Sequence, residues 1–224
     1  MRGLADLARG DLASLHAFLS GQGTRGTSLA AELDARHDTE QQDTLLTWAA
    51  RHGQAEAARL LLDSGASVGA TTGRGATALH IACQEGQIEC ARLLVEAGAA
   101  TDQAESEGRT PLYVASRQGH DQCVRLLLEV GAAMNQARNN GATPLFIACR
   151  KGHLECVRLL RDAGAAVNQA RNSGATPLFM ACQKGHLEIA RLLRDAGASL
   201  NQATEDGATP LYIASQQGHL EAAP

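Results

Sequence analysis

The sequence has few aromatic residues and no excess of positive charge. Phe, Tyr and Trp make up 3% of its 224 residues, although 44% of the residues are hydrophobic. A core with so few aromatic rings must be built from Leu, Ala, Val, Ile and Cys, and these residues suit thin helices that pack closely. The formal net charge is −4, so no global basic field draws the chain to nucleic acid or anionic lipid.

Signals for export and for membrane insertion are also missing. Asp6, Arg9 and Asp11 interrupt any apolar run near the N-terminus, which argues against a signal peptide. No uncharged stretch approaches the ~18 residues of a membrane span. We therefore expect a protein of the cytoplasm, with the nucleus as an alternative, that does not insert into a membrane.

The six cysteines include no CxxC pair, so the sequence indicates no structural zinc. They follow a repeated Thr by six or by thirteen residues, in positions that hold Ala, Ser or Ile elsewhere in the chain. Thiols in such positions behave as small hydrophobic residues and favour a reducing compartment. We expect no metal and no cofactor. The two sets are Cys83, Cys149 and Cys182, and Cys90, Cys123 and Cys156.

What the chain does contain is a repeat of 33 residues. The segment 143–175 is followed by the segment 176–208, which repeats it with 24 identities. A fixed period of this length is typical of solenoids, in which one repeat cannot bury its apolar face alone and stacks on its neighbours. The period is marked by Thr44, Thr77, Thr110, Thr143, Thr176 and Thr209.

Each repeat reads as two antiparallel helices and a projecting turn, so the predicted fold class is all-α. Thr143 is a suitable N-cap for the first helix, and Pro144 fits its first position, where no N–H is needed. Gly152 is expected to end this helix, because glycine adopts a left-handed backbone without steric cost. The second helix is expected to open at His153 and to end at Gly164. The residues that it is expected to bury are Leu154, Val157, Leu159 and Leu160.

Two regions are expected along the chain. Residues 1–43 are predicted to form a degenerate N-terminal capping unit with an inserted loop, and residues 44–224 to form the repeats, the last of them incomplete. Leu12, Leu15, Phe18 and Leu19 have the spacing of one helical face. The stretch that follows is eleven residues longer than the corresponding stretch of the next repeat. Residues 28–33 suit a short helical turn, and residues 34–43 read as exposed loop.

The repeats carry a recognisable motif. The first helices open with TALHIA, TPLYVA, TPLFIA, TPLFMA and TPLYIA, and with a weaker TLLTWA at Thr44. With the GH turn and the GA-x-VN ending, these residues closely resemble the ankyrin repeat, strongly over 44–224 and weakly over 4–21. The main departure lies three residues after each Thr, where the family usually has His and only His80 conforms. The resemblance implies an ankyrin-repeat solenoid that binds other proteins along a concave face.

In this family the binding face consists of the projecting turns and the exposed ends of the first helices. The corresponding positions here include a basic stretch across the third to fifth repeats. Guanidinium groups grip carboxylate or phosphate in bidentate fashion, so we hypothesise an acidic or phosphorylated ligand. The alternative is a solvated polar surface, where single ion pairs contribute only ~0–1 kcal/mol. The candidate partner-binding residues are Arg117, Gln118, Arg138, Asn139, Asn140, Arg150, Lys151, Arg171, Asn172, Ser173, Gln183 and Lys184.

Three further sets of residues recur with the period. The aromatic residues suit either an anchor row for a partner or packing between repeats, and packing is favoured. The histidines lie ~10 Å apart, too far for one metal ion, so a helix-terminal hydrogen bond is expected instead. The asparagines stand where some ankyrin proteins are hydroxylated by an asparaginyl hydroxylase, an expectation from the resemblance alone. The sets are Tyr113, Phe146, Phe179 and Tyr212; His120, His153, His186 and His219; and Asn135, Asn168 and Asn201.

No catalytic constellation is indicated, since GKT or GKS phosphate loops and HExxH are missing. We expect a non-catalytic, monomeric protein–protein interaction module without a small-molecule substrate. The alternative is a substrate-recognition or targeting arm of a larger signalling or ubiquitin-transfer enzyme whose catalytic domain lies outside this chain. Nucleic-acid binding is disfavoured by the negative charge and by the shortage of aromatic platforms. A purely structural spacer is a further alternative.

The sixth repeat contains a first helix, residues 209–217, but the sequence stops before a second helix can follow. We expect the chain to be a fragment or truncated product, and its last helix to fray, because the stacking face has no polar cap. Amide hydrogen exchange should therefore be faster there than in the middle repeats. Equal protection of the last and middle repeats would contradict this expectation.

Overall fold

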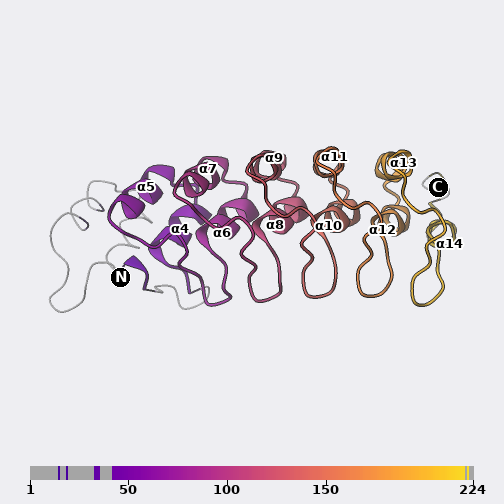
Figure 1. Cartoon of the computed structure of the whole chain (residues 1–224), viewed down its shortest axis with the longest axis horizontal. Coiled ribbons are helices and arrows are strands. Elements are labelled where there is room, and N and C mark those ends of the chain that lie inside the picture. The colour runs from indigo at the N-terminus through magenta and orange to yellow at the C-terminus, as the bar shows by residue number, and fades with distance from the viewer. Residues whose placement is uncertain (1–14, 16–18, 20–32, 36–41, 220, 222–224) are drawn as a thin grey trace. The chain divides into compact units, whose positions relative to one another are not determined.

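The computed structural model describes residues 15, 19, 33–35, 42–219 and 221, which form short helices joined by turns and projecting loops (Figure 1). The chain divides into two compact units, residues 1–106 and residues 107–224. The helices of the N-terminal unit are α4 (Leu45–Arg51), α5 (Ala55–Asp63), α6 (Ala78–Glu85) and α7 (Ile88–Glu96). The helices of the C-terminal unit are α8 (Pro111–Gln118), α9 (Asp121–Glu129), α10 (Pro144–Lys151), α11 (Leu154–Asp162), α12 (Pro177–Lys184), α13 (Leu187–Asp195) and α14 (Pro210–Gln216).

Most of the expected capping unit lies outside the described residues. Leu15 and Leu19 are helical and Leu15 is buried, while the expected face residues Leu12 and Phe18 are not described. The expected helical turn over 28–33 and the loop over 34–43 also fall largely outside the described part. Leu33, at the end of that expected turn, is helical and buried.

One residue of the expected loop differs from the prediction. Asp43 is only 1% exposed, whereas the stretch 34–43 was expected to face solvent. Its carboxylate accepts hydrogen bonds from Arg51 Nε at 2.9 Å and Arg51 Nη2 at 3.1 Å, and the Thr47 hydroxyl donates to it at 3.2 Å. A bidentate guanidinium partner and a hydroxyl donor satisfy the carboxylate, which allows it to be buried beside α4.

The first helix of each repeat forms where the capping residues predict it. The Phe146 N–H donates to Thr143 Oγ1 at 3.1 Å, and Pro144 occupies the first turn of α10. Gly152 follows the helix in the left-handed region with φ 83°, as predicted. A Cβ at Gly152 would lie 2.7 Å from the His186 ring, so only glycine fits between the two repeats.

The second helices bury a narrower stripe than the sequence predicts. In α11, Val157 and Leu160 are buried, but Leu154 and Leu159 are only half-buried. Cys156 is buried in their place. The reason is that α11 packs on α10 and more sparsely on its neighbours α9 and α13, so the stripe facing the core is covered while the residues at its margins stay partly exposed.

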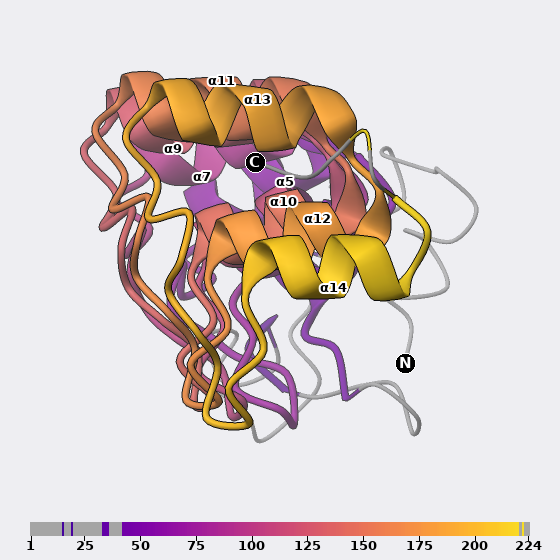
Figure 2. The same ribbon diagram turned by 90° about the vertical axis from the view of Figure 1, so that its right-hand side faces the viewer.

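Within the C-terminal unit, the first and second helices form two separate rows (Figure 1). α8, α10, α12 and α14 contact one another in sequence, and α9, α11 and α13 form the second row. The view along the stack shows the loops projecting together from one side of the first-helix row (Figure 2). The first-helix row lies between the loops and the second helices, so α10 is buried along Pro144–Cys149 and exposed only at Arg150 and Lys151.

Hydrogen bonds between neighbouring loops hold this unit in register. The Asn139 N–H donates to the Glu107 carbonyl at 3.1 Å, and the Asn172 N–H donates to the Asn140 carbonyl at 3.0 Å. Asparagine side chains add a second set nearer the second helices, where Asn168 Oδ1 accepts from the Ser199 N–H at 2.7 Å. Equivalent bonds one repeat apart make the loops a continuous ladder.

The recurring aromatic residues pack between repeats, in agreement with the favoured interpretation. Tyr113 and Phe146 are each 1% exposed, and Phe179 is also buried. Tyr212, at the same position of α14, is 57% exposed. The difference arises because no described helix packs on the far side of α14.

Ser116 places a polar hydroxyl group in this core. Its side chain is fully buried on α8, and its hydroxyl has no hydrogen-bond partner among the described residues. The same slot holds Ala50 and Cys149 in other repeats. We predict that Ser116→Ala raises the free energy of unfolding by about 1 kcal/mol, because an unsatisfied buried hydroxyl is removed.

Urea unfolding monitored by circular dichroism measures the change. Ser215→Ala is the matched control, because it makes the same substitution at the equivalent but exposed position of α14. Both variants gain a few tenths of a kcal/mol in helix propensity, so the difference between them reports the hydroxyl. A loss of stability in Ser116→Ala would contradict the prediction.

Candidate functional site

The predicted partner-binding residues fall into two groups with different surroundings. The loop group comprises Arg138, Asn139, Asn140, Arg171, Asn172 and Ser173. The helix-end group comprises Arg117, Gln118, Arg150, Lys151, Gln183 and Lys184. Both lie within the C-terminal unit, and the length of a first helix separates them.

In the loop group, Arg138 is held by two neighbours. Its Nη2 lies 2.9 Å from Glu107 Oε2 in the preceding loop. Its guanidinium carbon also lies 5.9 Å from the centre of the Tyr113 ring on α8, within cation–π range. Arg138 therefore covers a buried ring of the preceding repeat and is already neutralised.

Arg171 repeats this arrangement one period later. It lies 5.9 Å from the centre of the Phe146 ring, and its Nε donates to Ser173 Oγ at 2.7 Å. Asn172 Nδ2 donates to the Asn139 carbonyl at 3.4 Å, and Asn140 Oδ1 accepts from the Ala142 N–H at 3.2 Å. The loop group thus uses its polar atoms partly to join repeats and partly to hold each loop in shape.

The helix-end group is different. Arg117 is half-buried and Arg150, Lys151 and Lys184 are exposed, and none of the four has an ion-pair partner among the described residues. All four lie in the last turn of α8, α10 or α12, where a cation is stabilised by the helix dipole. We call Arg117, Arg150, Lys151 and Lys184 the inner basic row.

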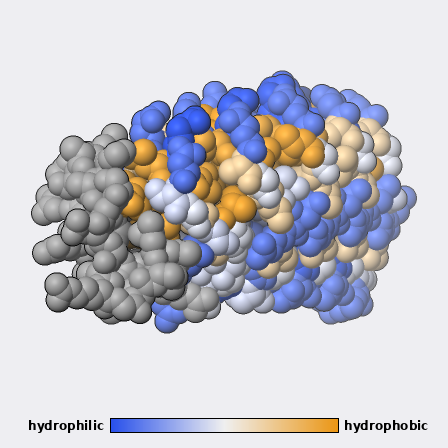
Figure 3. Space-filling model, turned by 60° about the vertical axis from the view of Figure 1, so that its left-hand side comes forward, coloured by the Kyte–Doolittle hydropathy of each residue, from blue (hydrophilic) through white to orange (hydrophobic). Residues whose placement is uncertain are grey.

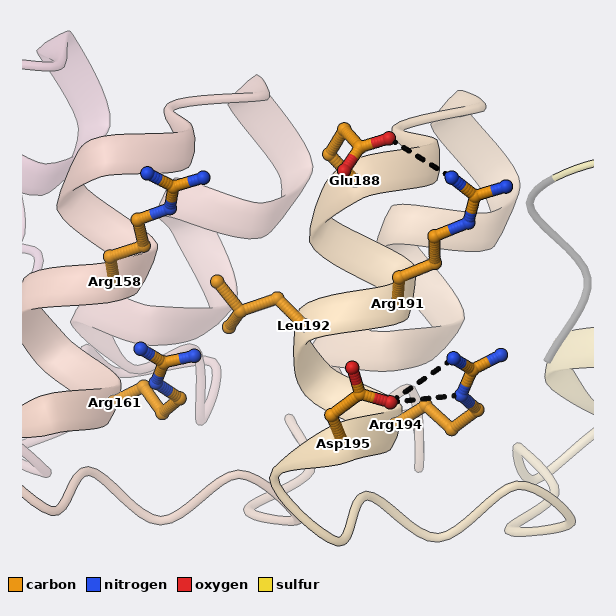
Figure 4. A pocket seen from close by; sticks show the side chains of 7 residues that line it. All are labelled: Arg158, Arg161, Glu188, Arg191, Leu192, Arg194 and Asp195. Carbon is orange, nitrogen blue, oxygen red and sulfur yellow. Dashed lines mark hydrogen bonds and ion pairs between the residues drawn. The ribbon is translucent and has the colours of Figure 1, made fainter.

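A second cluster of arginines lies between α11 and α13 on the second-helix row (Figure 4). Its groove is lined by Arg158 and Arg161 of α11 and by Arg191, Arg194, Glu188, Asp195 and Leu192 of α13. Each arginine there has a carboxylate within 4.0 Å, at distances of 2.6 to 4.0 Å. In contrast to the inner basic row, this outer groove is internally neutralised.

Figure 3 shows one face of the molecule by hydropathy. Toward the C-terminal end, hydrophilic residues form successive rows with narrower strips of less polar residues between them. No broad apolar patch appears on that part of the visible face, so it offers charged and polar groups to a ligand.

The recurring histidine has the helix-terminal role that was expected, but at a different helix. His153 opens α11, yet no side-chain bond caps that helix. Instead, His153 Nε2 donates to the Arg117 carbonyl at the end of α8, at 3.1 Å. The imidazole therefore caps the first helix of the preceding repeat. Among the described residues, no group of three or more His, Cys, Asp or Glu is placed to hold a metal ion.

The cysteines are structural. All six are free and buried, as the repeat positions predict. Burial raises the pKa of Cys182 to about 11, and burial together with the nearby Glu89 carboxylate raises the pKa of Cys90 to about 11. Because the thiolate is the nucleophile, these groups are inert near neutral pH.

A GxSxG pattern at residues 65–69 also lacks a catalytic setting. Catalytic serines of this motif occupy a turn between a strand and a helix. Here the pattern follows α5 and leads into a loop, and Ser67 is exposed. Its backbone N–H donates to Asp34 Oδ1 at 3.0 Å.

Sequence reasoning missed the structural use of Arg138 and Arg171. A signal was present, because an Arg five residues before a repeat Thr follows an aromatic residue in the preceding first helix. Tyr113 pairs with Arg138 in this way, and Phe146 with Arg171. Phe179 is followed at that position by Thr204, and no cation covers it in the described structure.

The arrangement of paired helices, linked loops and a 33-residue period defines a repeat solenoid. The family model "Ankyrin repeats (3 copies)" matches residues 8–104, 98–171 and 163–224. The chain therefore belongs to the ankyrin repeat family, whose repeats are protein–protein interaction modules, and its fold is the all-α solenoid predicted from the sequence.

A solved structure supports the same assignment. The ankyrin repeat domain of Bcl-3, described as a unique member of the IkappaB protein family, matches with a TM-score of 0.83 and 28% sequence identity. The match covers 99% of this chain and 97% of that domain. No curated protein matches the sequence. None of the helices in the described part has the length and apolar character needed to cross a membrane.

The two groups should respond differently to loss of charge. Arg138→Gln removes the ion pair with Glu107 and the contact with Tyr113, so we predict a loss of about 1–2 kcal/mol in the free energy of unfolding. Arg150→Gln removes the same charge from an exposed position without an ion pair, and should change stability by less than about 0.5 kcal/mol. Urea denaturation of both variants tests this, and equal losses would contradict the assignment.

Proposed function

We propose that this chain is a non-catalytic protein-binding module whose inner basic row, on the concave face of the stack, binds an acidic or phosphorylated segment of another protein. One observation carries the proposal: the row has no ion-pair partner in the described structure, whereas the arginines of the outer groove are all paired. The proposed contacts are charge-assisted hydrogen bonds from Arg117, Arg150, Lys151 and Lys184 to carboxylate or phosphate oxygens.

The finer details follow from the same surface. Gln118 and Gln183, beside the cations at the helix ends, are proposed to contact the partner as well. The loop residues Asn139, Asn140, Asn172 and Ser173 are proposed to border the bound segment, and Arg138 and Arg171 to hold the loops that shape the site. Bonds from Arg138 and Asn172 to the preceding loop, and from Arg171 to Ser173 within its own loop, are consistent with that role.

We further propose that the module acts as a monomer in a reducing intracellular compartment, the cytoplasm or the nucleus. Six free, buried cysteines support this setting, because such thiols persist where disulfides do not form. The negative net charge argues for a protein partner rather than a nucleic acid. A role without catalysis or a small-molecule substrate is part of the same proposal, in which neither the buried thiols Cys90 and Cys182 nor Ser67 acts as a nucleophile.

The test removes three charges from the row. In the triple variant Arg117→Gln, Arg150→Gln and Lys184→Gln, affinity for a fluorescein-labelled deca-glutamate peptide should fall about 10- to 100-fold. This range assumes up to ~1 kcal/mol for each exposed ion pair. Fluorescence anisotropy at low salt measures the affinity, and binding should weaken as salt is added. A phosphoserine peptide tests the phosphate arm, and deca-glutamine is the neutral control.

The matched control removes the same charge from the other face. Arg158→Gln, Arg191→Gln and Arg194→Gln neutralise three arginines of the outer groove in the same unit. These arginines are already paired, so affinity should change less than about threefold. If the inner and outer triple variants bind deca-glutamate equally well, the inner basic row is not the site.

A further inference from the structure

We propose that the segment bound by the inner basic row is extended, in a polyproline II conformation, with an acidic side chain at every third residue. This inference rests on the proposed function and adds the conformation and the spacing of the ligand. It follows from the regular spacing of the cations and from the uncharged glutamines that lie beside them.

The spacing comes from helix packing. The row steps from Arg117 on α8 to Arg150 and Lys151 on α10, and then to Lys184 on α12. Successive first helices are in direct contact, and packed helices lie about 8–10 Å apart. His153 joins the end of α8 to the next repeat through a 3.1 Å hydrogen bond, so the packing extends to the helix ends where the cations lie.

Only some chain conformations match this spacing. A polyproline II helix has three residues per turn and a rise of about 3.1 Å, so residues i and i+3 share a face about 9.3 Å apart. In a β-strand, side chains return to the same face every two residues, or about 6.6 Å, which is shorter than the distance between successive first helices. Four strand residues span more than that distance. An α-helix repeats its face about every seven residues, or about 10.5 Å, which is close.

The glutamines separate the two remaining conformations. Gln118 is next to Arg117 and is exposed, and Gln183 is next to Lys184 and is half-buried. Neither amide has a hydrogen-bond partner in the described part of the chain. A polyproline II backbone has unsatisfied N–H and C=O groups that such amides can bind, whereas the backbone of an α-helix is bonded internally. The row therefore fits an open backbone with acidic side chains in register.

Patterned peptides test the spacing in the full chain. Three fluorescein-labelled probes share four Glu residues: one has Glu at every third position on a Pro- and Ala-rich background, and one has Glu at alternate positions on the same background. The third has Glu at every seventh position of an Ala-rich helix. We expect the every-third peptide to bind about tenfold tighter than either of the others. The alternate pattern does not match the spacing of the helix ends, and the helical peptide has no free backbone groups for Gln118 and Gln183.

Arg150 and Lys151, the cations of α10 in the middle of the row, provide a control for the peptide preference. The double variant Arg150→Gln and Lys151→Gln should reduce the preference for the every-third peptide to less than about threefold, whereas Arg158→Gln with Arg191→Gln should preserve it. Equal affinity for the peptides, or a preference for the helical or alternate pattern, would overturn the inference. The deca-glutamate peptide contains every spacing, so its loss of affinity in the inner triple variant would still support the proposed function in that case.

Discussion

The first helices α8, α10 and α12 are each buried beside their neighbours, and the rest of the structure depends on this constraint. In α10 every residue from Pro144 to Cys149 is buried, so the helix faces solvent only over its last two residues. A helix of this length is marginal in water by itself. Its stability therefore derives from α8, α12 and α11, which it contacts. As a consequence, a ligand can reach this helix only at Arg150 and Lys151.

The contacts that hold the repeats together determine which polar residues remain for a partner. Arg138 lies over Tyr113, and Arg171 lies over Phe146. His153 caps α8, and Asn168 binds the backbone of the next repeat. All of these side chains connect one repeat with another, and each makes that contact before any ligand arrives. From the sequence alone the polar loop residues look available to a partner, but several of them already contact a neighbouring repeat.

The sequence predicted most of the fold because its signals are local. Thr143, Pro144 and Gly152 act within a few residues of themselves, through caps and backbone preferences that hold in any surroundings. The role of Arg138 was not predicted, because its partner Tyr113 lies in another repeat and the pairing depends on stacking. Burial of Asp43 was missed for a different reason. Its partner Arg51 is near in sequence, but the polar side chain becomes tolerable in the interior only once the guanidinium reaches it. The basic character of the helix ends was readable from sequence, but their lack of partners was not.

Competition within the protein decides which arginine cluster can attract a ligand. At the outer groove, Arg191 lies 3.2 Å from Glu188 and Arg194 lies 3.1 Å from Asp195. An incoming carboxylate would have to replace one of these ion pairs. Exchanging an internal pair for a pair with the ligand contributes little binding free energy, because exposed ion pairs are weak in water. Arg150 and Lys184 have no such competitor among the described residues, so a ligand carboxylate adds an interaction there instead of exchanging one. The two faces carry similar numbers of cations, and the difference between them lies in what those cations already bind.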